Sequence, residues 1–185
     1  MGKDGAYEKA KRKWKKAELD EMTEKFRQLG VEHPEGWART QVIEGIPNLS
    51  KFIFLKLLWR TIVKEGDSEW IDREIALAEK NPSDPFIGGG LALKSLRAKG
   101  ATDEELIDVV RNFQMEYLWD IVMLLDFGAN NVEDYAPAFA KGTDWVLAQI
   151  DEEGNIIDTL TELHELALVL DPTGRSGRIR GWVNE

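Results

Sequence analysis

The sequence predicts a mainly α-helical protein, a single-domain helical bundle with a small β-hairpin near its C-terminus. The chain has 185 residues, of which 43% are hydrophobic and 31% charged, enough to bury one core and keep a polar surface. Apolar residues at helical spacing recur between capping residues and glycines along most of the chain. Two β-favouring runs surround a Gly-Asn pair within residues 143–160. We therefore expect one domain over residues 1–185.

The N-terminus is basic although the chain as a whole is acidic. Residues 1–16 hold seven Lys or Arg against two carboxylates, a net charge of +5, which leaves −15 on the rest of a chain whose total is −10. Such a basic arm binds a phosphate surface or folds back on its own acidic domain. We favour folding back, because Glu8 and Arg12 are spaced as an ion pair on one helix from about Tyr7 to Leu29. An acidic body repels nucleic acid, so nucleic-acid binding is not expected.

Short helices separated by turns are expected between the first helix and residue 100. Glycines, prolines and capping side chains mark their ends. The expected elements are, in order, a turn at 32–36, a short helix at 37–44, a helix from Asn48 or Ser50 to Glu65, a helix from Asp67 or Ser68 to Lys80, a break at 81–85 and a helix at 91–99.

The segment after Thr102 predicts the longest helix, which ends near Phe127. Thr102 and Glu105 are spaced as a capping box, in which each side chain bonds the backbone N–H of the other residue. At about 100° per residue, apolar side chains collect on one face and carboxylates on another. The expected core face is Leu106, Val110, Phe113, Tyr117, Ile121, Leu124 and Leu125, and the expected acidic stripe is Glu105, Asp108, Glu116, Asp120 and Asp126.

An irregular stretch, residues 129–142, precedes the predicted hairpin. The strands of this hairpin are TDWVLAQI and IIDTL, joined by the turn DEEGN. One more helix is expected at 161–170, where the Asp-Pro pair that follows ends it. Residues 171–185 are predicted to be an irregular tail.

The acidic stripe also carries Trp119 and Met123, and it has two explanations. One is an ordinary solvated helix face, since charged residues are mostly exposed. The other is a docking face, on which carboxylates steer a basic partner protein and an aromatic side chain anchors it. The second explanation predicts a protein-binding module of the immunity-inhibitor or regulator type. Its predicted partner-binding residues are Asp108, Glu116, Trp119, Asp120 and Met123.

Two polar residues of the same helix do not belong to the acidic stripe. Gln114 falls among the expected core positions, and Arg111 lies at their edge. A buried amide needs hydrogen-bond partners, so one explanation is a structural role and the other is a small polar pocket. The pocket would also include His164 and Glu165, and it would make the protein an enzyme or a small-ligand-binding protein. Because no residue pattern indicates a particular reaction, catalysis is only the alternative to protein binding.

Three motif-like stretches fail on their spacing. GGGLALKS has Leu93 where a Walker phosphate loop needs a glycine before the lysine. HELAL has Leu168 where a zinc site of the H-E-x-x-H type needs its second histidine. DEEGN places Gly154 too early for a calcium loop. Since the chain also lacks cysteine and has only two histidines, no metal and no cofactor are expected.

The expected location is the cytoplasm. A membrane helix takes about 20 apolar residues, and no stretch of this sequence is that long without charge. The basic N-terminus is not followed by the apolar segment of a secretory signal. We therefore predict no membrane association, and the sequence does not indicate an oligomeric state.

Part of the sequence resembles a known group of proteins. The run LKSLRAKGATDEELIDVVRNFQMEYLWDIVMLLD, followed by DEEGN, LHE and DPTGR, is similar to a small family of bacterial helical proteins with no assigned biochemistry. The resemblance covers about residues 91–175 and not the N-terminal helices. It implies no reaction, but it draws attention to one polar set. That set is Arg111, Gln114, His164, Glu165 and Asp171.

Overall fold

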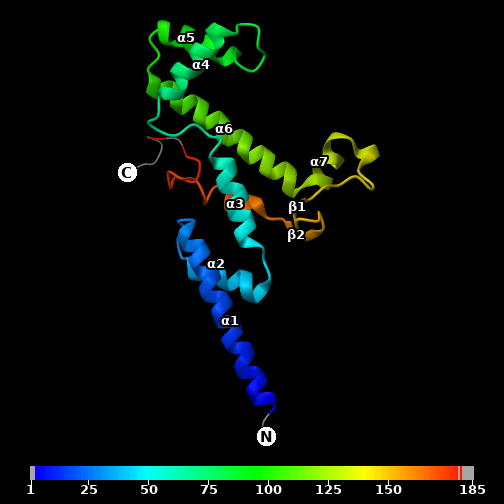
Figure 1. Ribbon diagram of the computed structural model, residues 1–185. Coiled ribbons are helices and arrows are strands. Elements are labelled where there is room, and N and C mark those ends of the chain that lie inside the picture. The colour runs from blue at the N-terminus through cyan, green and yellow to red at the C-terminus, as the bar shows by residue number, and fades with distance from the viewer. Residues whose placement is uncertain (1–2, 179, 181–185) are drawn as a thin grey trace. The chain divides into compact units, whose positions relative to one another are not determined.

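The protein is mainly α-helical with one antiparallel β-hairpin, which confirms the predicted fold class (Figure 1). The computed structural model describes residues 3–178 and 180, with side chains from Trp14 onward. The described chain falls into two compact units. One consists of the chain up to Phe54 together with residues 145–161, and the other consists of residues 55–144 and the chain from Glu162 onward. The organisation as a single domain stays a prediction.

The first unit contains the N-terminal helices and the hairpin. Its elements are α1 (Lys3–Gln28), α2 (Pro34–Arg39), the π-helical turn η1 (Thr40–Glu44), the beginning of α3 (Asn48–Trp59), β1 (Leu147–Ile150) and β2 (Ile156–Leu160). Most of the basic arm, from Lys3 onward, is the first part of α1, while residues 1 and 2 lie outside the described residues. Trp14, Lys15 and Lys16 are exposed, so this part of the arm does not fold back onto a core.

Aromatic side chains form the core of the first unit. Phe52 packs edge-on against Phe26, with ring centroids 5.4 Å apart, and against Trp37, with centroids 4.9 Å apart. Edge-to-face pairs of this kind add to the free energy gained by burying the rings. The hairpin joins the unit through Ser50, whose hydroxyl donates to the side-chain oxygen of Gln149 over 2.5 Å. The hairpin is confirmed, with Leu147 opposite Leu160. Its second strand has the predicted bounds, whereas the first begins at Leu147, four residues later than predicted.

The second unit is built around the long helix α6 (Asp103–Asp126). Its other elements are the end of α3, α4 (Glu69–Lys80), α5 (Gly88–Ala98), α7 (Gly128–Tyr135), the 3₁₀ turn η2 (Pro137–Phe139) and α8 (Leu163–Ala167). The capping box at the start of α6 is confirmed, because Thr102 accepts from the backbone of Glu105 while the Glu105 carboxylate accepts from the backbone of Thr102. The stretch at 129–142, predicted to be irregular, instead holds most of α7 and all of η2, neither of which was predicted.

Helix α3 ends at Trp59, six residues before the predicted end at Glu65. The reason lies at Val63, whose backbone bonds to side chains of α6. Its N–H donates to the side-chain oxygen of Gln114 over 2.7 Å, and its carbonyl accepts from Arg111 over 3.1 Å. These two bonds satisfy the peptide groups that a longer helix would have paired within itself.

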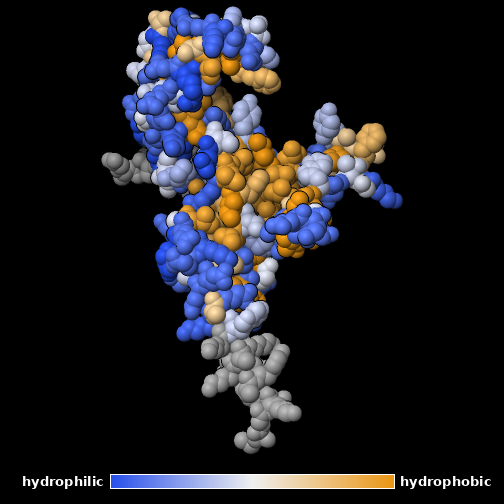
Figure 2. Space-filling view, in the orientation of Figure 1, coloured by the Kyte–Doolittle hydropathy of each residue, from blue (hydrophilic) through white to orange (hydrophobic). Residues whose placement is uncertain are grey.

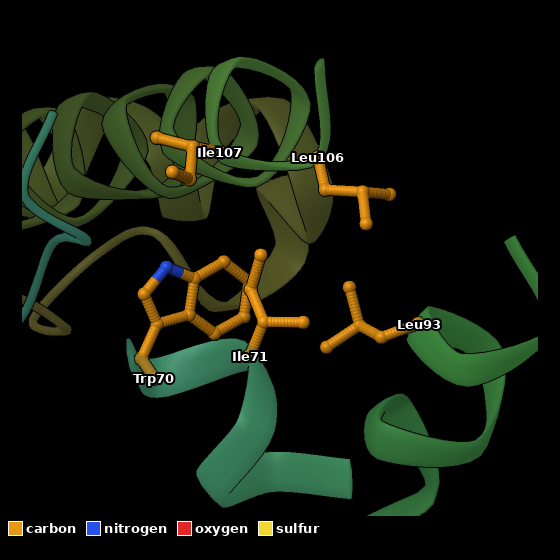
Figure 3. Packing of buried hydrophobic residues seen from close by; sticks show 5 residues of the cluster. All are labelled: Trp70, Ile71, Leu93, Leu106 and Ile107. Atoms are coloured by element: carbon orange, nitrogen blue, oxygen red, sulfur yellow. The ribbon is translucent and has the colours of Figure 1, made fainter. Parts of the chain in front are cut away.

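An apolar cluster joins α4, α5 and the first turns of α6. Figure 3 shows Trp70 and Ile71 from α4, Leu93 from α5, and Leu106 and Ile107 from α6 converging on one another. Helices α4 and α5 can pack closely because residue 90 is a glycine. A Cβ atom built on Gly90 would lie 2.1 Å from the backbone carbonyl oxygen of Glu74, so only glycine fits there.

No helix in the described part of the chain combines the length and the apolar character needed to cross a membrane.

Candidate functional site

The buried face of α6 differs from the predicted one by about 90° around the helix axis. Leu106 is buried as expected, but Phe113 is 56% exposed and Tyr117 is 67% exposed. Ile121 and Leu124 are also exposed. The side chains that α6 buries beyond Leu106 are Ile107, Leu118 and Val122. The prediction of the core face was therefore wrong over the middle of the helix.

Polar groups turned toward the interior explain this difference. Arg111 and Gln114 both lie on the inward face and both bond the backbone of Val63. The Arg111 side chain is 11% exposed, and its guanidinium group lies 5.7 Å from the centroid of the Trp59 ring. Trp59 in turn donates its indole N–H to the carbonyl of Ala167 over 2.7 Å. The helix thus buries polar side chains that have partners, while several apolar ones remain outside.

Asp171 is the counterion of Arg111, at 2.8 Å, and its side chain is 1% exposed. It also accepts hydrogen bonds from the backbone N–H and the hydroxyl of Thr173 and from the backbone N–H of Gly177. Burial raises the pKa of Asp171, but these hydrogen bonds and the charge of Arg111 outweigh burial, so the pKa lies below its ordinary value. Of the polar set that the resemblance pointed to, Arg111, Gln114 and Asp171 therefore form one structural network.

His164 lies at the other end of α6. Its ring Nδ1 is 2.8 Å from Asp126, which also accepts from the backbone N–H of His164, and the Asp126 side chain is 2% exposed. Arg111 and Asp126 are fifteen residues apart on one helix, which is about 22 Å along its axis. Glu165 is exposed on α8. The predicted pocket residues are thus split, with Arg111 and Gln114 together and His164 elsewhere, and Asp126 belongs to a buried pair rather than to the acidic stripe.

Three of the five predicted partner-binding residues, Glu116, Trp119 and Asp120, line a region that is open to solvent. Glu116 and Asp120 are exposed, and Trp119 and Met123 are half-buried. Asp108 is different, because it accepts from Arg180, which also pairs with Glu65 and Glu104. We call the carboxylates of Glu116 and Asp120 the acidic ridge.

A hollow lies beside the acidic ridge. Its volume is about 460 Å³, and Met115, Trp119 and Leu168 provide its apolar lining. Glu116 and Asp120 stand at its edge, so apolar surface and negative charge lie next to each other. A groove of this composition suits a basic side chain whose neighbour is apolar.

An apolar row runs along the other side of the acidic ridge. Val109, Phe113, Tyr117 and Ile121 recur every four residues, and between 45% and 67% of each is exposed. Figure 2 shows apolar side chains gathering over α6 on the face in view. Large apolar side chains that remain contiguous and exposed mark a surface that another molecule covers. Phe113, Tyr117 and Ile121 were predicted to lie in the core, because an apolar stripe on a helix has the same spacing in a core and in an interface.

Comparisons of the chain with protein-family models, curated proteins and solved structures each found no match. The resemblance over residues 91–175 therefore stays a prediction. Among residues 3–178 and 180, no three His, Cys, Asp or Glu side chains are grouped so that they could hold a metal ion.

Proposed function

We propose that this protein is a protein-binding module that engages a basic partner through the exposed face of α6. The observation that carries the proposal is the acidic ridge, Glu116 and Asp120, placed between the hollow and the apolar row. Carboxylates guide the encounter with a basic partner, and apolar surface on both sides supplies the area that is buried afterwards. An inhibitor of a basic enzyme, of the immunity type, or another regulator works in this way.

Trp119 is the expected anchor of the interface. It lines the hollow while remaining half-buried, so a partner side chain can contact its ring without any rearrangement of α6. Tryptophan is enriched among residues that carry most of the binding free energy. Val109, Phe113, Tyr117 and Ile121 extend the surface along about three turns of helix.

The charge of the whole chain supports a basic partner. With a net charge of −10, the protein attracts cations over distances beyond direct contact, and the attraction weakens as salt is added. We expect the association rate to fall with ionic strength more strongly than the dissociation rate rises.

The enzyme alternative has less support. It required Arg111, Gln114 and His164 to share a pocket, and His164 instead bonds to Asp126 at the far end of α6. Arg111 and Gln114 instead both bond the backbone of Val63, in the loop after α3.

The test is a comparison of two charge-reversed variants of the full chain. Glu116→Lys with Asp120→Lys changes the ridge, whereas Glu152→Lys with Glu153→Lys makes the same change of net charge at the exposed turn of the hairpin. A partner captured by the wild type should be lost with the ridge variant and with Trp119→Ala, and retained with the hairpin variant.

Hydrogen exchange of the captured complex then locates the interface. Binding should slow exchange over residues 113–123, and it should leave the hairpin unchanged. Equal capture by both charge-reversed variants, or protection confined to another element, would contradict the proposal. Concentration-dependent self-association that the ridge variant abolishes would assign the surface to a second copy of the chain instead.

A further inference from the structure

We propose that the second unit also binds a small organic anion, in a pocket formed by the end of α3, the loop after it and residues 170–173. The pocket has a volume of about 480 Å³. This lies within the range of about 300–1,000 Å³ that is usual for sites of small organic ligands. The pocket is separate from the hollow beside Trp119, and the inference does not depend on the proposed protein-binding function.

Cations dominate the rim of this pocket, which we call the basic pocket. Lys56, Arg60 and Lys64 follow one another at intervals of four residues and all line it. Among the described residues, no ion pair joins any of these three side chains to a carboxylate. In a chain with ten more carboxylates than cations, three neighbouring cations without counterions are a site where a ligand can supply the negative charge.

Arg111 also lines the pocket, but its charge is paired with Asp171, so the unpaired positive charge of the rim comes from Lys56, Arg60 and Lys64. Asp171 and the carbonyl of Val63 hold its guanidinium group, which lies over the Trp59 ring. Among the described residues, Glu65 is the only carboxylate that lines the pocket, and it pairs with Arg175 at 2.8 Å and with Arg180 at 3.6 Å. Glu65 therefore does not neutralise the cations of the rim.

The interior of the basic pocket is apolar. Trp59 and Ile62 are buried and form part of its wall, together with Leu170 and Pro172. The hydrogen bond from Trp59 to Ala167 holds the indole ring in one orientation. An inorganic ion would leave this apolar surface uncovered. The structure instead suits a flat apolar body that carries a carboxylate or a phosphate group toward Lys56, Arg60 and Lys64.

The probe for this site is 1-anilinonaphthalene-8-sulfonate, an aromatic anion that fluoresces when it leaves water. Titration of the full chain should show saturable binding that weakens as salt is added. Replacing Lys56, Arg60 and Lys64 together by Gln should lower the affinity about tenfold or more, because the charge-assisted contacts to the sulfonate are lost. The matched control replaces Lys80, Lys99 and Lys141 by Gln, which are exposed cations outside the pocket, and it should leave the affinity unchanged.

Titrations of two more variants separate this site from the surface on α6, and a titration with an uncharged dye tests the role of charge. Phe113→Ser with Ile121→Ser, and the Glu116→Lys with Asp120→Lys ridge variant, should both bind the dye as the wild type does. Uncharged N-phenyl-1-naphthylamine should bind less tightly than the anionic dye. An equal loss of dye affinity in the pocket triple and the control triple, or a loss only when the apolar row is changed, would overturn the inference.

Competition identifies the chemistry of the ligand. Phenyl phosphate and benzoate share an aromatic ring and differ in the anionic group, so the stronger competitor shows which group the cations prefer. Stronger competition by either compound supports the site, provided that this compound displaces the dye from the wild type at a lower concentration than from the pocket triple. Inorganic phosphate competing as strongly as phenyl phosphate would overturn it, because the apolar wall would then contribute nothing. Circular dichroism and the thermal midpoint show that both triples remain folded.

Discussion

Near its beginning, α6 buries Leu106 and Ile107 against apolar side chains of α4 and α5. Around its middle, the same helix turns Arg111 and Gln114 inward and leaves Phe113 and Tyr117 exposed. At the first end, apolar area removed from water drives packing. In the middle, specific hydrogen bonds and one ion pair hold Arg111 and Gln114 on the inward face. Polar partners therefore fix the orientation of the helix there, rather than burial of its most apolar face.

This difference has a functional consequence. If burial of apolar area alone set the orientation of α6, Phe113, Tyr117 and Ile121 would face inward and the ridge would stand alone on the surface. The polar network around Arg111 instead leaves the apolar row beside Glu116 and Asp120. The orientation of α6 and the proposed binding surface therefore depend on the same few buried contacts.

The largest expected effect comes from breaking that polar network at Asp171. Asp171→Ala leaves the guanidinium group of Arg111 buried without its counterion and removes the acceptor of two backbone N–H groups. Removing one partner of a buried ion pair costs about 3–5 kcal/mol of unfolding free energy. Urea unfolding at neutral pH measures the loss. The control Asp120→Ala removes an exposed carboxylate of α6 and should change the unfolding free energy by less than about 0.5 kcal/mol.

Acid provides a second check on the same carboxylate. The folded-state pKa of Asp171 lies below its unfolded value, so its contribution to stability is present above the unfolded pKa and is lost as pH falls through the folded pKa. The wild type should lose this contribution on acidification, and Asp171→Ala has none to lose. The gap in unfolding free energy between the two proteins should therefore narrow as pH is lowered. A gap that stays constant with pH would show that the carboxylate charge is not what stabilises the network.

The apolar end of α6 is tested at Gly90. Gly90→Ala places a methyl group 2.1 Å from the Glu74 carbonyl oxygen, so α4 and α5 must separate, and overpacking of this kind costs about 1–3 kcal/mol. Gly89→Ala is the matched control, since no atom lies within 4 Å of its Cβ position. Replacing glycine by alanine within a helix is otherwise favourable by about 1 kcal/mol. The two neighbouring substitutions should shift the thermal midpoint in opposite directions, and equal shifts would rule out close packing at Gly90.

Local signals in the sequence were sufficient for most of the fold. The capping box at Thr102 and the glycine turn at Gly154 are set by neighbours in the chain, so the start of α6 and the hairpin were predicted correctly. The early end of α3 was not, because Gln114 and Arg111, about fifty residues away, bond the backbone of Val63. No pattern within residues 48–65 carries that information.

Only part of the candidate surface was predicted, again because contacts with distant parts of the chain decide which side chains stay exposed. Glu116 and Asp120 are exposed as charged residues usually are, and their positions follow from helical spacing alone. Asp108 and Asp126 share that spacing, but Arg180 and His164 bind them from distant parts of the chain. Three residues of the apolar row, Phe113, Tyr117 and Ile121, were assigned to the core, because the free energy of burial favours that assignment unless partners for Arg111 and Gln114 are known.

The smallest expected effect distinguishes an interface from a core on one helix. Ile121→Ala removes an exposed side chain, so it should change the unfolding free energy by less than about 0.5 kcal/mol. Leu118→Ala removes a buried side chain of similar size and should cost about 2–5 kcal/mol. Chemical unfolding of both variants measures the difference. Near-equal losses of unfolding free energy would mean that Ile121 is covered within the folded chain. An Ile121→Ala protein that stays stable but no longer retains its partner would show that the row serves binding.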